Sequence, residues 1–170
     1  MEDLFDLLDD IVKNIANALH VELVTEVSEW SIAESLEVWE YTMKAVEFLN
    51  HYTKEHNSKA RELLEKALKL EPKNSPALTL LSACHLIDFG FGFSESPSES
   101  FKIGVEIAKK ALALHGEKAG PQISMSFVYF LQGQHDKAII STKKAISIEP
   151  NYADACRMLG FYLHIQPSPG

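Results

Sequence analysis

The sequence of 170 residues predicts an all-α fold in which helical hairpins repeat and stack into an α-α superhelix. Apolar residues recur at the spacing of amphipathic helices, and no segment shows the alternation typical of a strand. Prolines and glycines separate these segments at regular intervals. A frame of small residues, Ala-x6-Ala-x4-Pro, occurs at 60–72 and again at 138–150 with the same spacing. The pattern predicts about three repeats and a terminal half repeat, preceded by an amphipathic helix.

The helices predicted from these patterns span 3–23, 32–53, 58–70, 76–88, 97–115, 121–132, 135–148 and 153–165. Ser31 and Ser96 are each followed three residues later by glutamate, which predicts capping boxes at two helix starts. Pro76 and Pro121 stand at the first position of their helices, where no amide donor is needed.

The first of these helices lies in an acidic segment, 1–31, that comprises the helix and a linker. Its apolar stripe is formed by Leu4, Leu8, Ile11, Ile15 and Leu19. Two arrangements remain open: the helix packs in a groove of the array or against its first repeat, or it simply adds one helix to the stack. Residues 1–40 hold eleven acids against Lys13, whereas residues 41–170 hold 13 acids and 15 bases. This distribution argues against nucleic-acid binding.

The frame of small residues also appears, more weakly, at 104–116, with Gly104 and Ala111 in the places of the alanines. The second helix of each hairpin can approach its neighbours closely at these positions, and the final proline ends it. In its spacing the chain resembles the tetratricopeptide repeat, a helix–turn–helix unit of 34 residues. The best unit, 119–152, matches at Met125, Ser126, Tyr129, Gly133, Ala138, Ala145 and Pro150.

The resemblance divides the array, 32–165, into units at about 38–74, 75–118 and 119–152, a half repeat at 153–165, and a tail at 166–170. The second unit carries ten extra residues near 89–98, and the first carries three in its turn. The resemblance implies a non-catalytic module that binds a protein or peptide in a concave groove lined by the first helix of each repeat. The implied groove residues are Trp39, Val46, Leu49, Thr79, Ala83, Leu86, Ile123, Phe127, Phe130, Arg157 and Phe161.

An acidic helix followed by such repeats also resembles the C-terminal region of bacterial signalling proteins that carry adenylate or guanylate cyclase or winged-helix domains. That resemblance implies an accessory role in a regulatory protein. A homodimerisation module and a small-ligand sensor at the loop 89–93 remain as alternative functions. Phe89, Phe91 and Phe93 alternate with glycines in that loop, which is interpreted as an ordered turn or as a ligand contact.

The half repeat has no second helix to cover it. We expect Cys156, Leu159, Gly160 and Leu163 to pack backward on the preceding hairpin. The surface then left for a homodimer, or for a continuation of the chain, consists of Met158, Phe161, Tyr162 and Ile165.

No chemistry of an enzyme is predicted. Seven scattered histidines give no metal-ligand spacing, and no set of nucleophile and base can be assembled, so we expect no metal, cofactor or catalytic residue. Cys84 and Cys156 are expected to be buried, reduced thiols, which fits the cytoplasm. No secretory signal or apolar run of membrane-spanning length is present, which predicts a protein that does not insert into membranes.

Overall fold

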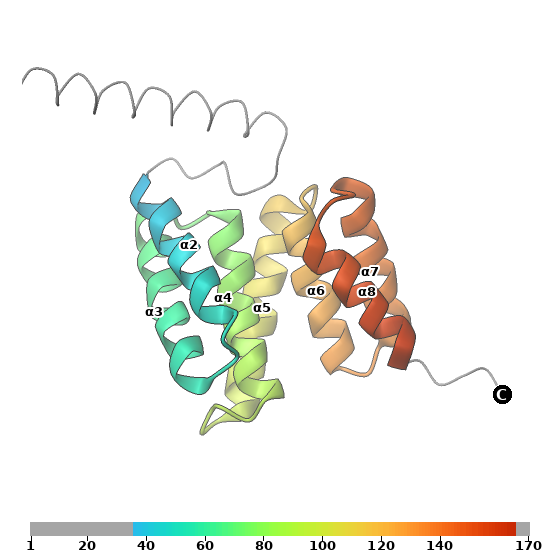
Figure 1. Cartoon of the computed structure of the whole chain (residues 1–170), viewed down its shortest axis with the longest axis horizontal. Coiled ribbons are helices and arrows are strands. Elements are labelled where there is room, and N and C mark those ends of the chain that lie inside the picture. The colour runs from blue at the N-terminus through green and yellow to red at the C-terminus, as the bar shows by residue number, and fades with distance from the viewer. Residues whose placement is uncertain (1–35, 166–170) are drawn as a thin grey trace, which may run out of the picture. The chain divides into compact units, whose positions relative to one another are not determined.

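The computed structural model describes residues 36–165, which belong to the second of two compact units, Met1–Ile32 and Ala33–Gly170. The predicted helix 3–23, the capping box at Ser31 and the tail 166–170 lie outside the described residues. Within 36–165 the chain forms helices and no strands, which confirms the all-α prediction. The helices are α2 (Leu36–Leu49), α3 (Lys54–Leu70), α4 (Ser75–Gly90), α5 (Pro97–His115), α6 (Ala119–Leu131), α7 (His135–Ile148) and α8 (Ala153–Ile165) (Figure 1).

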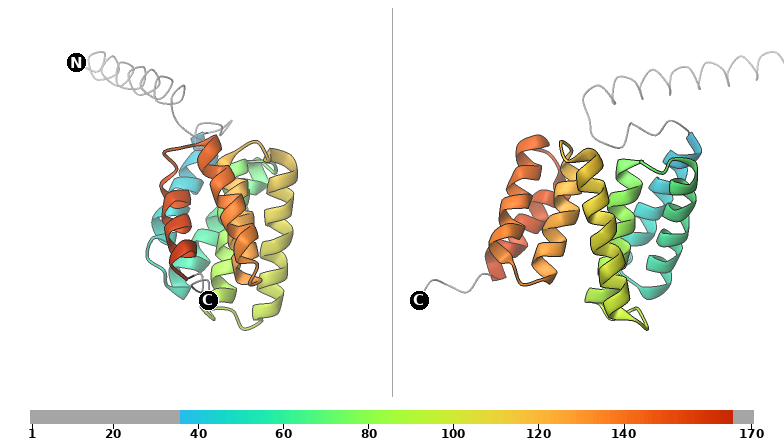
Figure 2. Two further views of the ribbon diagram at one scale, coloured as in Figure 1. Left: turned by 90° about the vertical axis from the view of Figure 1, so that its right-hand side faces the viewer. Right: turned by 180° about the vertical axis from the view of Figure 1, so that it is seen from behind.

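Each helix packs against the next one along the chain, and alternate helices α2, α4, α6 and α8 also contact one another in sequence. These contacts make α2, α4, α6 and α8 the inner helices, and α3, α5 and α7 are the outer helices of the successive hairpins (Figure 2). The described residues therefore form three hairpins and a final single helix. This is the helical repeat solenoid that the sequence predicts.

The first hairpin corrects two predicted boundaries. The α2 helix ends at Leu49 rather than at 53, and α3 begins at Lys54 rather than at 58. Tyr52 adopts a φ of 50°, which breaks the helix, and the Thr53 side chain accepts the His56 amide at 3.3 Å. A side-chain acceptor at this place satisfies one of the free amides of a helix start.

Two further helix starts differ in detail from the prediction. The Asn74 side chain accepts the Ala77 amide at 3.0 Å, so that α4 begins one residue before its proline. The predicted capping box at Ser96 is wrong, because Ser96 makes no side-chain cap. Its amide instead donates to the Ser94 hydroxyl at 3.1 Å, and Ser94 also accepts the hydroxyl of Ser100 at 2.8 Å.

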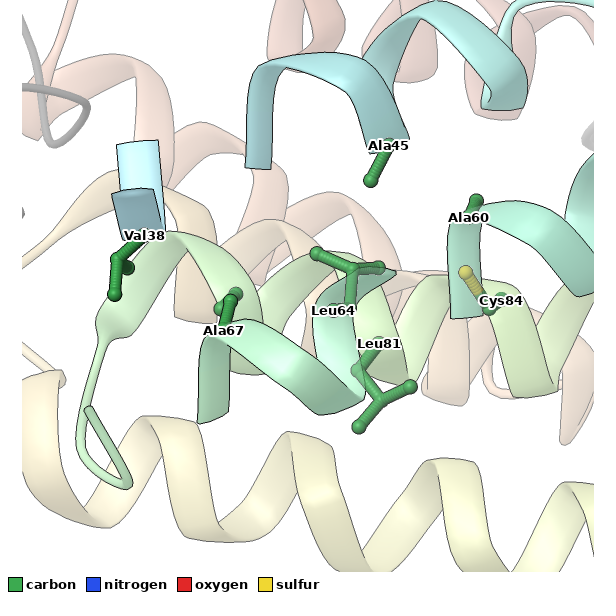
Figure 3. Packing of buried hydrophobic residues seen from close by; sticks show 8 residues of the cluster. Val38, Ala45, Ala60, Leu64, Ala67, Leu81 and Cys84 are labelled. Atoms are coloured by element: carbon green, nitrogen blue, oxygen red, sulfur yellow. The ribbon is translucent and has the colours of Figure 1, made fainter. Parts of the chain in front are cut away.

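The small residues of the repeated frame lie in the core. The side chains of Ala60 and Ala67 on α3 are fully buried, together with Ala45 on α2 and Leu64 and Cys84 (Figure 3). The equivalent residues of the last hairpin, Ala138 and Ala145, are buried as well. Small side chains at these places allow the helix backbones to approach closely, which is the packing that the frame predicts.

Two glycines end inner helices in the same way. Gly92 and Gly133 have φ values of +69° and +72°, a left-handed conformation that favours glycine. After α4 the Phe93 amide donates to the Asp88 carbonyl at 3.0 Å, and after α6 the Gln134 amide donates to the Tyr129 carbonyl at 2.8 Å. This is the Schellman ending of a helix. The glycine-rich segment 89–93 therefore serves as a helix terminator.

Candidate functional site

The predicted groove residues lie on the inner helices, but they differ in accessibility. Six of them are half-buried: Trp39, Val46, Leu49, Ala83, Phe127 and Phe130. Arg157 is exposed, and Phe161 has 52% of its surface accessible. Thr79, Leu86 and Ile123 are buried and offer little surface to a partner, and their role in the groove stays a prediction.

Leu86 is buried where α4 and α5 pack closely at Gly104. A β-carbon on Gly104 of α5 would lie 2.9 Å from the Leu86 side chain, and Gly104 also accepts the Ser82 hydroxyl at 2.8 Å. Leu86 belongs to a core with Met125 and Val128 of α6.

Ile123 is covered by the last helix. It packs in a cluster with Ala119, Ala145 and Ala155, which come from α6, α7 and α8. The inner helices therefore pack closely at their buried positions. The partly accessible surface of these helices is formed by the larger side chains around those positions.

Phe130 connects α6 to α8. Its ring stacks on Tyr162 with centroids 5.0 Å apart and meets the edge of Phe161 at 5.5 Å. The ring of His135 lies 5.7 Å away. Phe130 thus stabilises the junction of the last hairpin with α8 and leaves only part of its surface for a partner.

The orientation of α8 differs from the prediction. Tyr162, predicted to be exposed, is 1% accessible, and Met158 packs against the cores formed with α6 and α7. Tyr162 occupies the place that faces the preceding hairpin in the second and third repeats, where the equivalent residues Cys84 and Val128 are also buried. Only Phe161 of the predicted dimer surface is well exposed, and Ile165 is half-buried.

The residues predicted to pack backward are instead mostly accessible. Cys156 and Gly160 are exposed, Leu163 is 51% accessible and Leu159 is half-buried. The expectation of two buried thiols therefore holds for Cys84 alone. Burial raises the pKa of the Cys84 thiol to about 12, which makes it a poor nucleophile.

The sequence prediction missed an aromatic pair at one end of the inner helices. Tyr52 and Phe91 are 51% and 58% accessible, and their ring centroids lie 6.3 Å apart. Both belong to turns that join an inner helix to its outer helix. Such turns of successive repeats lie at the same end of the stack (Figure 1). The extra residues in the first and second units could therefore have been predicted to meet.

Arg157 adds an exposed positive charge on α8. Its guanidinium donates to the Asp154 carboxylate at 3.0 Å, and this bond, with a contribution from the Tyr52 phenol, raises the pKa of Arg157.

A buried polar cluster holds the first two hairpins together. The Asn57 amide donates to an Asp88 carboxylate oxygen at 2.7 Å and to the Cys84 carbonyl at 2.9 Å, and Arg61 donates to the other Asp88 oxygen at 2.6 Å. Because the carboxylate is buried and paired, the cluster joins α3 to α4.

Other features of residues 36–165 do not indicate chemistry. They contain no group of three histidine, cysteine or acidic side chains arranged to hold a metal ion. Nor does this part of the chain contain a helix with the length and apolar composition of a membrane span. A surface hollow of about 510 Å³ lies on α3, away from the predicted groove, and is lined by Lys54, Glu55, Ser58, Lys59 and Glu62.

Comparisons with known proteins agree with this architecture. Residues 123–152 match the family model of the tetratricopeptide repeat, within the unit predicted at 119–152. No curated protein sequence matches the chain. A solved structure of a mutant O-GlcNAc transferase from Thermobaculum terrenum is similar, with a TM-score of 0.58 and 21% identity. The match covers 79% of this chain but 23% of that protein, so it concerns the fold alone. Residues 123–152 are a tetratricopeptide repeat, and the hairpins before it and the helix after it extend the same all-α repeat fold.

Proposed function

We propose that this chain is a non-catalytic protein-interaction module that binds an apolar helix or peptide along its inner helices. Tetratricopeptide repeats generally mediate contacts between proteins. The observation that carries the proposal is a difference between the two sides of the array. Each of the four inner helices is more apolar than each of the three outer helices. Partly accessible aromatic rings are found on the apolar side.

The accessible residues suggest the chemistry of the partner. Trp39, Leu49 and Phe127 offer half-buried apolar surface that a helix or extended peptide could cover. Aromatic side chains in such surfaces often contribute most of the binding free energy. The exposed Arg157 could pair with an acidic side chain or a terminal carboxylate of the partner. The proposed ligand is therefore an apolar peptide segment with an acidic residue at one end.

A displayed library of random peptides tests this proposal. Peptides selected on the full chain should lose affinity when the inner side is changed by Phe127→Ala or by Arg157→Glu. Phe127 also contacts the core, so circular dichroism must show that its variant is folded. The exposed Arg157 supplies a second variant with little structural role.

The matched control is Ile140→Ala, which shortens a side chain of α7 that is 65% accessible on the outer side. Selected peptides should bind this variant as they bind the unchanged protein. Equal binding to all three variants would refute the assignment of the inner side.

The proposal extends to the setting of the module. An acidic segment before such repeats supports an accessory role in a cytoplasmic signalling or regulatory protein. Expression of the chain together with the products of its adjacent genes, followed by co-purification, tests this role. Association with a catalytic or DNA-binding protein of such a system would support it, and association only with proteins outside regulation would contradict it.

A further inference from the structure

Three aromatic rings come together on two turns at one end of the stack (Figure 1). Tyr52 belongs to the turn between α2 and α3, and Phe91 and Phe93 belong to the turn between α4 and α5. The ring centroid of Phe91 lies 6.3 Å from that of Tyr52 and 5.6 Å from that of Phe93. These rings are called the aromatic row. Tyr52 and Phe91 are each more than half accessible, and clustered apolar surface of this kind is typical of a binding site.

Tyr52 owes its exposed place to an unusual backbone conformation. Its φ of 50° lies in the left-handed region, which glycine adopts readily and tyrosine rarely. The turns after α4 and α6 have glycines, Gly92 and Gly133, in this conformation. The turn after α2 has a tyrosine instead, although glycine would avoid the strain. A strained residue with an accessible ring indicates that the ring is used at the surface.

The turn that carries Phe91 and Phe93 is fastened to the first hairpin. The Asp88 carboxylate accepts bonds from Asn57 and Arg61 of α3 at 2.7 and 2.6 Å. The backbone carbonyl of the same Asp88 accepts the Phe93 amide at 3.0 Å. Because one buried residue holds both α3 and the turn, the rings are positioned before any ligand arrives. Binding to a pre-positioned surface loses little conformational entropy.

The surroundings of the aromatic row limit the kind of partner. The turns 50–53 and 91–96 hold one carboxylate, Glu95, and no lysine or arginine, so they offer no arginine cluster for a phosphorylated peptide. Rings that are more than half accessible do not line a groove into which a helix docks. Residues 36–165 form no strand to which an extended chain could pair. Among the recurring modes of peptide recognition, the docking of a polyproline II helix on exposed aromatic rings remains.

We propose that Tyr52, Phe91 and Phe93 bind a proline-rich segment of a partner protein in the polyproline II conformation. This helix rises about 3.1 Å per residue, so three to five residues span the aromatic row. Its carbonyls make no internal hydrogen bonds, and the phenol of Tyr52 supplies a donor for one of them. The surface lies on turns and is separate from the inner-side site of the proposed function, on which it does not depend.

Fluorescence polarisation with a labelled decaproline peptide tests the proposal on the full chain. Decaproline should bind with a Kd below about 500 µM, the highest protein concentration used. A glycine–serine peptide of the same length is flexible and offers no proline rings, so it should bind at least about tenfold more weakly.

Two variants remove one ring each. Tyr52→Gly should remain folded, because the φ of this residue favours glycine, and should weaken binding about fivefold or more. Phe91→Ala, at an ordinary φ of −98°, should weaken it to a similar extent. The matched control is Phe161→Ala, which removes a ring of similar accessibility from the inner side. It should change the Kd less than about twofold, and circular dichroism checks the fold of all three variants.

Three results would overturn the proposal. Decaproline could fail to bind at the highest concentration. The glycine–serine peptide could bind as tightly, which would show that the polyproline conformation is not recognised. Phe161→Ala could weaken binding as much as Tyr52→Gly and Phe91→Ala do, or more, which would place the peptide elsewhere. The proposed function of the inner side is judged separately, by Phe127→Ala and Arg157→Glu.

Discussion

The same substitution at two helical glycines should change stability in opposite directions. Gly104 and Gly160 both lie within helices, and replacement of such a glycine by alanine normally stabilises a protein by about 1 kcal/mol. At Gly160 the new methyl group enters open space. Gly160→Ala should therefore raise the free energy of unfolding by about 0.5–1 kcal/mol.

At Gly104 the same methyl group meets a packed core. It would lie 2.9 Å from Leu86 Cδ2, 3.0 Å from Leu86 Cγ and 3.3 Å from His85 Cβ. Leu86 is fully buried and cannot move away freely. Overpacking of this kind costs about 1–3 kcal/mol, which outweighs the gain in helix propensity. Gly104→Ala should therefore be about 1 kcal/mol less stable than the unchanged protein, and about 2 kcal/mol less stable than Gly160→Ala.

Urea unfolding followed by circular dichroism measures this difference, and thermal unfolding should show the two variants on opposite sides of the unchanged protein. If Gly104→Ala proved as stable as Gly160→Ala, the close approach of α4 and α5 would not limit the size of this residue, and the explanation for the buried Leu86 would fail.

Three further predictions concern the thiols, the buried ion pair and a histidine. One thiol per folded chain should react with a disulfide reagent near pH 8, because burial raises the pKa of Cys84 to about 12, and both should react in denaturant; two reactive thiols in the folded chain would contradict this. Arg61→Met should lower the free energy of unfolding by about 1–3 kcal/mol by leaving the buried Asp88 carboxylate with fewer partners, whereas Lys59→Met, which breaks an exposed pair, should change it by less than about 0.5 kcal/mol in urea unfolding. Burial, assisted by Arg61, lowers the pKa of His85 below its ordinary value of 6.5, so the unfolded chain binds this proton more readily. The stability contributed by the neutral, buried His85 side chain should therefore be present above that pH value, and the free energy of unfolding should decline as the pH falls below it. His85→Gln should make the decline of Tm in acid shallower.

Much of the helical architecture follows from local signals. The predicted ranges 97–115, 135–148 and 153–165 agree with α5, α7 and α8, since prolines and glycines mark most of the boundaries. The boundary between α2 and α3 was predicted wrongly because the turn contains neither residue type. It depends on the Thr53 cap and on the left-handed Tyr52, a conformation that tyrosine rarely adopts.

Which face of a helix packs inward is harder to predict than where the helix begins and ends. The apolar residues of α8 surround most of the helix, so amphipathicity alone does not show which side packs inward. Comparison of Tyr162 with Cys84 and Val128 in the earlier repeats would have given the right orientation. The burial of Leu86 could not be predicted in this way, because it depends on the close approach of α5 at Gly104.

The connections between helices differ in length at the two ends of the stack. Those from an outer helix to the next inner helix span 71–74, 116–118 and 149–152, and they vary by one residue. Those inside the hairpins span 50–53, 91–96 and 132–134, and they vary more. The uniform connections set the pitch at which hairpins follow one another, whereas the variable ones can gain or lose length without altering it. A short reporter peptide inserted at 94–96 should therefore leave the order and spacing of the hairpins intact.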